Sequence, residues 1–315
     1  MYSVNQWLMK KIKTAFHLLY RTGIAFSDDN AFKLSASLSY YTIFALGPLL
    51  IIIISLAGIF FGKDAVRGKI YEELRGLIGG DAALQIQDII SNVQHTHATT
   101  IGAVVGIVIL VIAATGVFTE MQGSINFIWS VRAKPKKGWL KYLGNRLISF
   151  SLVVGLSFVL LVSLIINALL TLLSDRLVRL FPHSTVYLFN VVNTIVILSV
   201  ITGLFAVIYK VLPDAIISWK DALIGSAFTA LLFLLGKFMI GFYLGKANLD
   251  VTYGAAASIV ILLTWVYYSS LILYFGAEFT KVYALHSGEG IRPKQTAVFI
   301  IKRETKEITI SHLDT

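Results

Sequence analysis

One uninterrupted stretch without a charged side chain, residues 34–62, constrains this chain more than any other feature. About 20 apolar residues in a helix cover the ~30 Å hydrocarbon core of a bilayer, so this stretch is long enough to cross one. Only 14% of the residues are charged, against about 25% in soluble domains. The sequence therefore predicts an all-α, polytopic membrane protein with six transmembrane helices. The five further apolar runs are residues 101–119, 147–174, 184–209, 222–236 and 251–277.

The distribution of Lys and Arg predicts the topology. With six crossings, 19 of the 27 Lys and Arg residues fall on one side of the membrane and 7 on the other, and Lys237 lies within a span. Basic loops stay in the cytoplasm, so both termini are predicted to be cytoplasmic. The net charge of +10 is then mostly a topology signal, and we expect no nucleic-acid partner.

The pattern divides the chain into three parts. Residues 1–30 are predicted to form an N-terminal amphipathic interfacial helix, because apolar residues recur on one face and cationic residues lie elsewhere. The short polar residues from Ser27 to Asn30 are predicted to break this helix and can cap the first span. Residues 31–285 form the six-helix transmembrane domain. Its exterior helical loop between spans 1 and 2, residues 63–100, is either a lid or partner platform or a connector on the membrane surface. Residues 286–315 are a cytoplasmic tail, with a short alternating run that is either a small strand or disordered.

Polar residues inside spans are candidates for function, because a central charge costs about 2.5–3.5 kcal/mol on insertion scales. Lys237 either extends its ammonium to the outer interface or faces an interior cavity, where it would attract an anion. Glu120 and Glu278 lie at the predicted cytoplasmic ends of their helices. Each either pairs with a loop Lys or Arg or serves as a proton or cation site. Asn126 is expected to line the interior, and Pro48 to kink the first span.

The sequence lacks the motifs of most catalytic centres. It has no Cys, and no G-x-x-x-x-G-K-[ST] phosphate loop, so an ATP-driven pump is not encoded in this chain alone. Of the His residues only His95 and His97 are closely spaced, and no acidic residue beside them completes a metal site. We therefore predict no cofactor, no metal and no enzymatic activity. Small residues at four-residue spacing predict close helix packing.

The most distinctive motifs lie in five segments, in this order along the chain: residues 36–42 with Gly47 and Pro48, residues 116–129, residues 219–225, residues 253–255 with 265–268, and residues 275–279. Together they resemble the motifs of the YihY / virulence factor BrkB family. The resemblance implies a bacterial inner-membrane (plasma-membrane), multi-pass protein of six helices. That family was once labelled ribonuclease BN, some members are linked to resistance to serum killing, and relatives have been proposed to move lipids or lipid A precursors. It has no established catalytic residues to carry over.

Composition and resemblance together predict lipid or lipid-precursor transport or flipping in envelope biogenesis, without an ATPase of its own. Anionic lipid headgroups are the expected partners, with a second copy of the chain or an envelope protein as further partners. The alternatives are a membrane-bound tRNA-processing ribonuclease, which the missing metal ligands disfavour, and a scaffold for an envelope complex. The residues expected to contact substrate are Lys237, Glu120, Asn126, Glu278, Pro48 and Tyr253.

The topology is testable with reporter fusions at residues 80, 140 and 315. The Lys and Arg asymmetry predicts an exterior signal from residue 80 and cytoplasmic signals from residues 140 and 315. A cytoplasmic signal from residue 80 would overturn the predicted topology.

Overall fold

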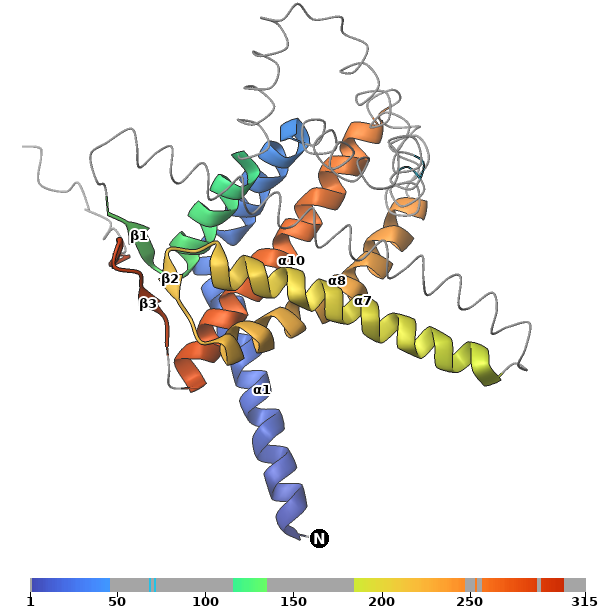
Figure 1. Ribbon diagram of the computed structural model, residues 1–315, viewed down its shortest axis with the longest axis horizontal. Helices are drawn as coiled ribbons and strands as arrows, with labels where there is room; N and C mark the ends of the chain where they lie inside the picture. Colours follow the sequence, from blue (N-terminus) through green and yellow to red (C-terminus); the bar gives the residue numbers. More distant parts are fainter. Residues whose placement is uncertain are drawn as a thin grey trace, which may run out of the picture.

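The computed structural model describes residues 2–45, 116–134, 184–246, 257–287 and 290–302, together with positions 68, 71 and 253. This part of the chain is mostly helical, as predicted (Figure 1). Its named helices are α1 (Tyr2–Asp28), α7 (Ser184–Val211), α8 (Trp219–Lys246) and α10 (Ala257–Ser287). Residues 31–45 and 116–128 are also helical. The described residues also form four short strands: β1 (Val131–Ala133), β2 (Ala215–Ile216), β3 (Arg292–Pro293) and β4 (Ala297–Phe299).

Three of the described helices are long and apolar enough to cross a membrane. The qualifying segments are Thr194–Val211, Trp219–Ile240 and Ile259–His286. They coincide with the fourth, fifth and sixth predicted spans, since apolar length is a local property of the sequence. The other three predicted spans and the exterior loop, residues 63–100, lie wholly or largely outside the described residues.

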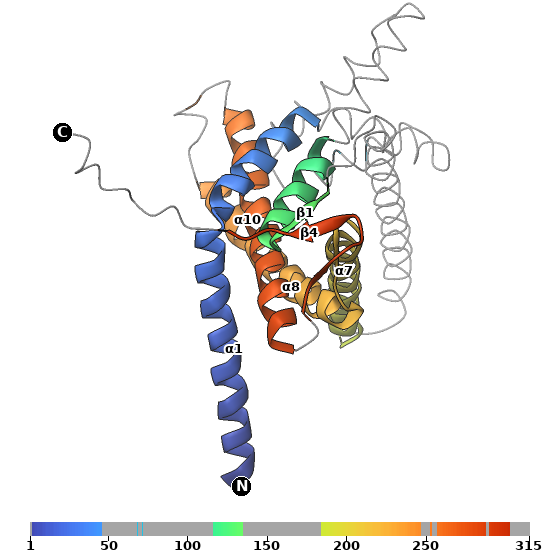
Figure 2. The same cartoon turned by 90° about the vertical axis from the view of Figure 1, so that its left-hand side faces the viewer.

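The transmembrane helices pack in sequence order. Helix α8 contacts both α7 and α10, and α10 in turn contacts α1 (Figures 1 and 2). The N-terminal half of α1 projects away from the other helices in both views. Helix α8 begins with a serine cap, because Ser218 Oγ accepts a hydrogen bond of 3.1 Å from the Asp221 N–H. The acidic Asp221 in the first turn also suits the positive end of the helix dipole.

Helices α8 and α10 pack closely at two glycines, one on each helix. A methyl group on Gly225 of α8 would lie 1.9 Å from Thr280 Oγ1 of α10. The arrangement is reciprocal, since a methyl group on Gly276 of α10 would lie 1.9 Å from Thr229 Oγ1 of α8. The glycine of each helix thus packs against the threonine of the other helix. Such small-residue contacts drive helix association where no hydrophobic effect operates between helices.

Four buried Ser and Thr hydroxyl groups of α8 and α10 donate hydrogen bonds within their own helices. Thr229 Oγ1 donates to the Gly225 carbonyl at 2.7 Å, and Thr280 Oγ1 donates to the Gly276 carbonyl at 2.6 Å. Ser226 and Ser270 make the same bond to the carbonyl four residues earlier. These side chains can therefore pack between helices without leaving a hydroxyl group unsatisfied.

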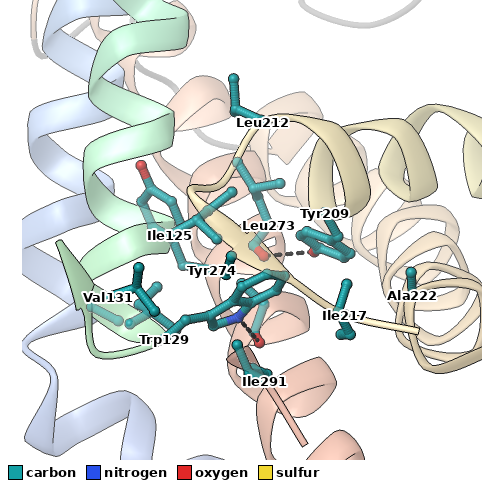
Figure 3. Packing of buried hydrophobic residues seen from close by; sticks show 14 of the residues in the cluster. Ile125, Trp129, Val131, Tyr209, Leu212, Ile217, Ala222, Leu273, Tyr274 and Ile291 are labelled. Carbon is teal, nitrogen blue, oxygen red and sulfur yellow. Dashed lines mark hydrogen bonds between the residues drawn. The ribbon is translucent and has the colours of Figure 1, made fainter. Parts of the chain in front are cut away.

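Two large buried side chains fix neighbouring helices to the α10 backbone (Figure 3). The Tyr209 hydroxyl of α7 donates to the Leu273 carbonyl at 2.8 Å and lies 3.1 Å from Thr229 Oγ1. Trp129, at the end of the helix at residues 116–128, donates from Nε1 to the Ala277 carbonyl at 3.0 Å. Both side chains are almost completely buried. They occupy the core where the helix ends converge.

Residues 291–302, which we call the C-terminal strap, fold back onto the helical body. Strand β3 pairs antiparallel with β2 in the α7–α8 connection, and β4 pairs antiparallel with β1 after residues 116–128. Ile291 and Ala297 of the strap belong to the buried core. The alternating run in the predicted tail is therefore a short strand over Ala297–Phe299. Nothing in the sequence had indicated that these residues of the predicted tail pair with β1 and β2.

The glycine contact predicts a large difference between two chemically identical substitutions. Gly276→Ala should destabilise the protein by about 1–3 kcal/mol, because the new methyl group overlaps Thr229 and Tyr209. Gly203→Ala on α7 is the matched control, since no atom lies within 4 Å of its added methyl group. Thermal unfolding of the detergent-solubilised variants measures both effects. Equal unfolding temperatures of the Gly276→Ala and Gly203→Ala variants would contradict the close packing of α8 against α10.

Candidate functional site

A break between two helices positions the first residue of the candidate site. Helix α1 ends at Asp28, and Asn30 adopts a left-handed conformation with φ of 52°. Asparagine tolerates this conformation better than most residues. The chain then starts a new helix at residue 31, and the turn directs Asp29 inward, where only 5% of the residue is exposed. The sequence had indicated this break, but as a cap and not as a functional position.

Two carboxyl groups and two lysines meet at this turn. Lys281 Nζ lies 3.2 Å from Asp29 Oδ2 and 3.3 Å from Glu278 Oε2. Lys302 Nζ of the C-terminal strap lies 2.5 Å from Asp29 Oδ1 and 4.3 Å from the centre of the Phe127 ring. We call Asp29, Glu278, Lys281 and Lys302 the acid–lysine cluster. It joins the end of α1, the last turns of α10 and the strap.

The cluster favours the ionised form of Asp29. Burial by itself raises the pKa of this carboxyl group, but the hydrogen bond from Lys302 and the charges of Lys281 and Lys302 outweigh it. The net effect holds the pKa of Asp29 below its ordinary value. Asp29 is thus the anion on which both lysines converge.

Glu278 is in a different situation from Asp29. Its side chain is completely buried, and its only cationic contact among the described residues is the one it shares with Asp29. Its second oxygen, Oε1, has no hydrogen-bond partner in the described part of the chain. A buried carboxylate is normally satisfied by several donors. The two acids of the cluster are therefore unequal.

Two other predicted residues take part in separate contacts. Glu120 is half-buried and accepts a hydrogen bond of 2.6 Å from Ser37 Oγ, which joins two helices. Asn126 is buried and exchanges two hydrogen bonds of 2.8 Å with Asp214 after α7. Gln122 adds a third bond to Asp214, at 3.3 Å. Asn126 is thus satisfied by the α7–α8 connection.

Lys237 lies on α8, the helix that contains the fifth predicted span. It is exposed on α8, next to Phe238 and Met239, which are 78% and 64% exposed. Gly236 instead faces α10, where a methyl group would lie 2.6 Å from Ile272 Cδ1. The exposure of Lys237 fits the alternative, a lysine that reaches the membrane interface.

The last two predicted residues are Tyr253 and Pro48. Tyr253 is 48% exposed, and Pro48 lies outside the described residues. Of the predicted residues that the structure describes, only Glu278 belongs to the acid–lysine cluster. Glu120, Asn126 and Lys237 contact or face other parts of the fold.

Sequence reasoning missed three members of the cluster. Lys281 follows Glu278 by three positions, a spacing that places two side chains on one helix face, and this was the signal available. Asp29 and Lys302 are 273 positions apart, and nothing in the sequence pairs them. Among the described residues no three His, Cys, Asp or Glu side chains lie together as a metal site, and His95 and His97 are outside this part of the chain.

Apolar helices of spanning length around buried ionisable groups define a helical membrane protein. The family comparison agrees, because residues 24–300 match the family model described as virulence factor BrkB. The chain belongs to the virulence factor BrkB family. The matched range includes three residues of the acid–lysine cluster, and Lys302 follows it by two positions.

The relatives are described as UPF0761 membrane proteins. One from Alcanivorax borkumensis is 28% identical over 279 residues, which is 86% of this chain and 60% of the relative. One from Psychromonas ingrahamii is 28% identical over 279 residues, covering 87% of this chain and 89% of the relative. One from Chromobacterium violaceum is 28% identical over 267 residues, covering 82% and 60%. The chain thus spans about three-fifths of two of these relatives. No solved structure matches this chain.

The cluster predicts that Lys302 holds the strap in place. Lys302→Gln should raise amide hydrogen exchange in residues 297–302 by about tenfold or more, because a hydrogen bond to a charged group contributes roughly 1.5–3 kcal/mol. Lys33→Gln, an exposed lysine just beyond the α1 break, is the control and should leave exchange unchanged.

Acidification should have the same effect as Lys302→Gln. Since the folded-state pKa of Asp29 lies below its ordinary value, its contribution to stability is present at neutral pH. That contribution is lost as the pH falls through the folded-state pKa. Exchange in the strap that is insensitive to both Lys302→Gln and acid would rule out the lysine contact as its anchor.

Proposed function

We propose that this protein moves lipids or lipid precursors across the bacterial inner membrane during envelope biogenesis, without an ATPase of its own. The observation that carries the proposal is the fully buried Glu278 at the end of an apolar span. Ionisable residues within membrane helices are expensive, and they mark substrate, ion or proton pathways. The sequence has no phosphate loop, so an ion gradient is the energy source that fits this chain.

The exposed face of α1 supports contact with lipid. Ile12, Phe16 and Ile24 are 64%, 72% and 45% exposed, and no other described element covers the N-terminal half of the helix (Figure 2). Exposed Lys13 and Arg21 lie on the same helix. Each cationic residue near an anionic membrane surface contributes about 1 kcal/mol to binding. We propose that α1 lies in the headgroup layer on the cytoplasmic side, with six spans and both termini cytoplasmic.

The two alternative functions have less support than lipid movement. A tRNA-processing ribonuclease has only the former family label and the positive charge in its favour, and the charge is explained by topology. A scaffold for an envelope complex, or a homo-oligomer, would use exposed apolar surface such as that of α1, but neither needs a buried carboxyl group. Lipid movement uses both features, and we therefore prefer it.

Reconstitution tests the proposal directly. With an ion gradient across the membrane, proteoliposomes with the protein and a fluorescent anionic phospholipid should show faster transfer between leaflets than protein-free vesicles, measured by quenching from outside. Proteoliposomes with the denatured protein are the control. The purified protein should not cleave tRNA precursors in the presence of divalent metal. Unchanged lipid transfer would contradict the proposal, and metal-dependent cleavage that is lost on substitution of His95 and His97 would favour the ribonuclease instead.

A further inference from the structure

We propose that Glu278 and Asp29 form a proton-binding site that holds one proton between their carboxyl groups at neutral pH. The proposal deepens the proposed function, on which it rests for the role of the proton. It assigns the ion whose gradient would drive lipid movement. The site itself stands on the geometry of the acid–lysine cluster.

The unpaired oxygen of Glu278 is the first observation. Glu278 is 0% exposed, and its Oε1 has no donor among the described residues. Its other oxygen has one donor, Lys281, at 3.3 Å. An ionised carboxylate in such a place would lack the donors that replace water. A neutral carboxyl group needs fewer donors and supplies one of its own.

The neighbouring acid is the second observation. The carboxyl groups of Asp29 and Glu278 share one cation, since Lys281 Nζ lies 3.2 Å from Asp29 Oδ2 and 3.3 Å from Glu278 Oε2. Two carboxyl groups this close, in a region with little water, do not readily ionise together. A proton on Glu278 removes the repulsion and donates a hydrogen bond to Asp29. The proton then belongs to the pair, as in other carboxyl dyads.

The lysines decide which acid is ionised. Lys281 and Lys302 both contact Asp29, at 3.2 Å and 2.5 Å, whereas only Lys281 contacts Glu278. Asp29 is therefore the better-stabilised anion, and Glu278 carries the proton. These two lysines are the charged groups that face the pair from α10 and the strap. Asp28 and Lys33, the charged residues on either side of the turn, are exposed.

A path to water follows from the exposures in the cluster. Glu278 is completely buried, Asp29 is 5% exposed, and the Lys281 and Lys302 side chains are 19% and 28% exposed. Exposure to solvent within the cluster thus increases from Glu278 to Lys302 of the strap. A proton can reach Glu278 from the strap side without crossing the apolar span. Movement of the strap would change access to the site.

Infrared difference spectroscopy tests the site without any transport assay. The wild-type protein at neutral pH should show the C=O band of a protonated carboxyl group that shifts in heavy water and disappears as the pH is raised. Glu278→Gln should remove this band. Glu120→Gln should keep it, because Glu120 is half-buried and already accepts a hydrogen bond from Ser37. No protonated band in the wild type, or a band that survives Glu278→Gln, would overturn the proposal.

Stability provides a second measurement on the same variant. Glutamine has the shape of protonated glutamate and can donate from its amide to Asp29, so Glu278→Gln should leave the unfolding midpoint near that of the wild type. Lys281→Met, which removes the cation shared by both acids, should lower it. A midpoint that falls as far in Glu278→Gln as in Lys281→Met would mean that Glu278 is an ordinary ionised partner of Lys281.

Lipid transfer under a pH gradient separates the two proposals. Wild-type proteoliposomes should transfer lipid faster in one gradient direction, and Glu278→Gln should abolish this dependence. A protonated band without lipid transfer would leave the proton site standing and overturn the proposed function. Transfer that ignores the gradient, with the band present, would overturn the coupling between the two.

Discussion

The close approach of α8 and α10 is the contact on which the rest of the described structure depends. Lipid tails are as apolar as the helix surfaces, so burial of apolar area cannot hold the helices together. Gly225 and Gly276 allow each backbone to accept the threonine of the other helix. The same contact presents the Leu273 and Ala277 carbonyls to Tyr209 and Trp129. Three neighbouring elements are thereby positioned on one stretch of α10.

The glycine contact also places the acid–lysine cluster. Glu278 lies two positions after Gly276 and two before Thr280, so the packing that buries these residues against α8 fixes the segment of α10 that carries the carboxyl group. Asp29 and Lys302 reach it from opposite ends of the chain. The strap pairs with β2 and β1 before it ends at Lys302. The strap therefore links three segments to the acid–lysine cluster: the α7–α8 connection, the segment after residues 116–128 and the α1 break.

The predictable part of the fold is the part encoded by local sequence. Apolar length predicted spans at residues 184–209, 222–236 and 251–277, which overlap α7, α8 and α10, because a helix in lipid must satisfy its own backbone. Ser27 to Asn30 predicted the end of α1, since short polar residues favour helix boundaries. The other predicted spans and the exterior loop fall largely outside the described residues and stay predictions.

The site was only partly predictable, for a physical reason. The cost of a carboxyl group in an apolar span identified Glu278 from the sequence alone. The same cost argument selected Lys237, but a long side chain near the end of a span can reach the surface, and this lysine is exposed. Asp29 and Lys302 meet only after the strap has folded back. Contacts across such sequence distances depend on tertiary packing, which residue spacing does not encode.

A distance measurement between the end of α1 and the strap tests the ionic connection most directly. The chain has no native cysteine, so spin labels at Ser27 and Ile301, which are both exposed, would be the only labels on the protein. Double electron–electron resonance at neutral pH should give one narrow distribution of distances between the labels in the otherwise wild-type protein. The distribution should be broad when Asp29→Asn is added. A broad distribution without that substitution, or a narrow one that Asp29→Asn does not alter, would contradict an acid–lysine cluster that holds the strap to the helices.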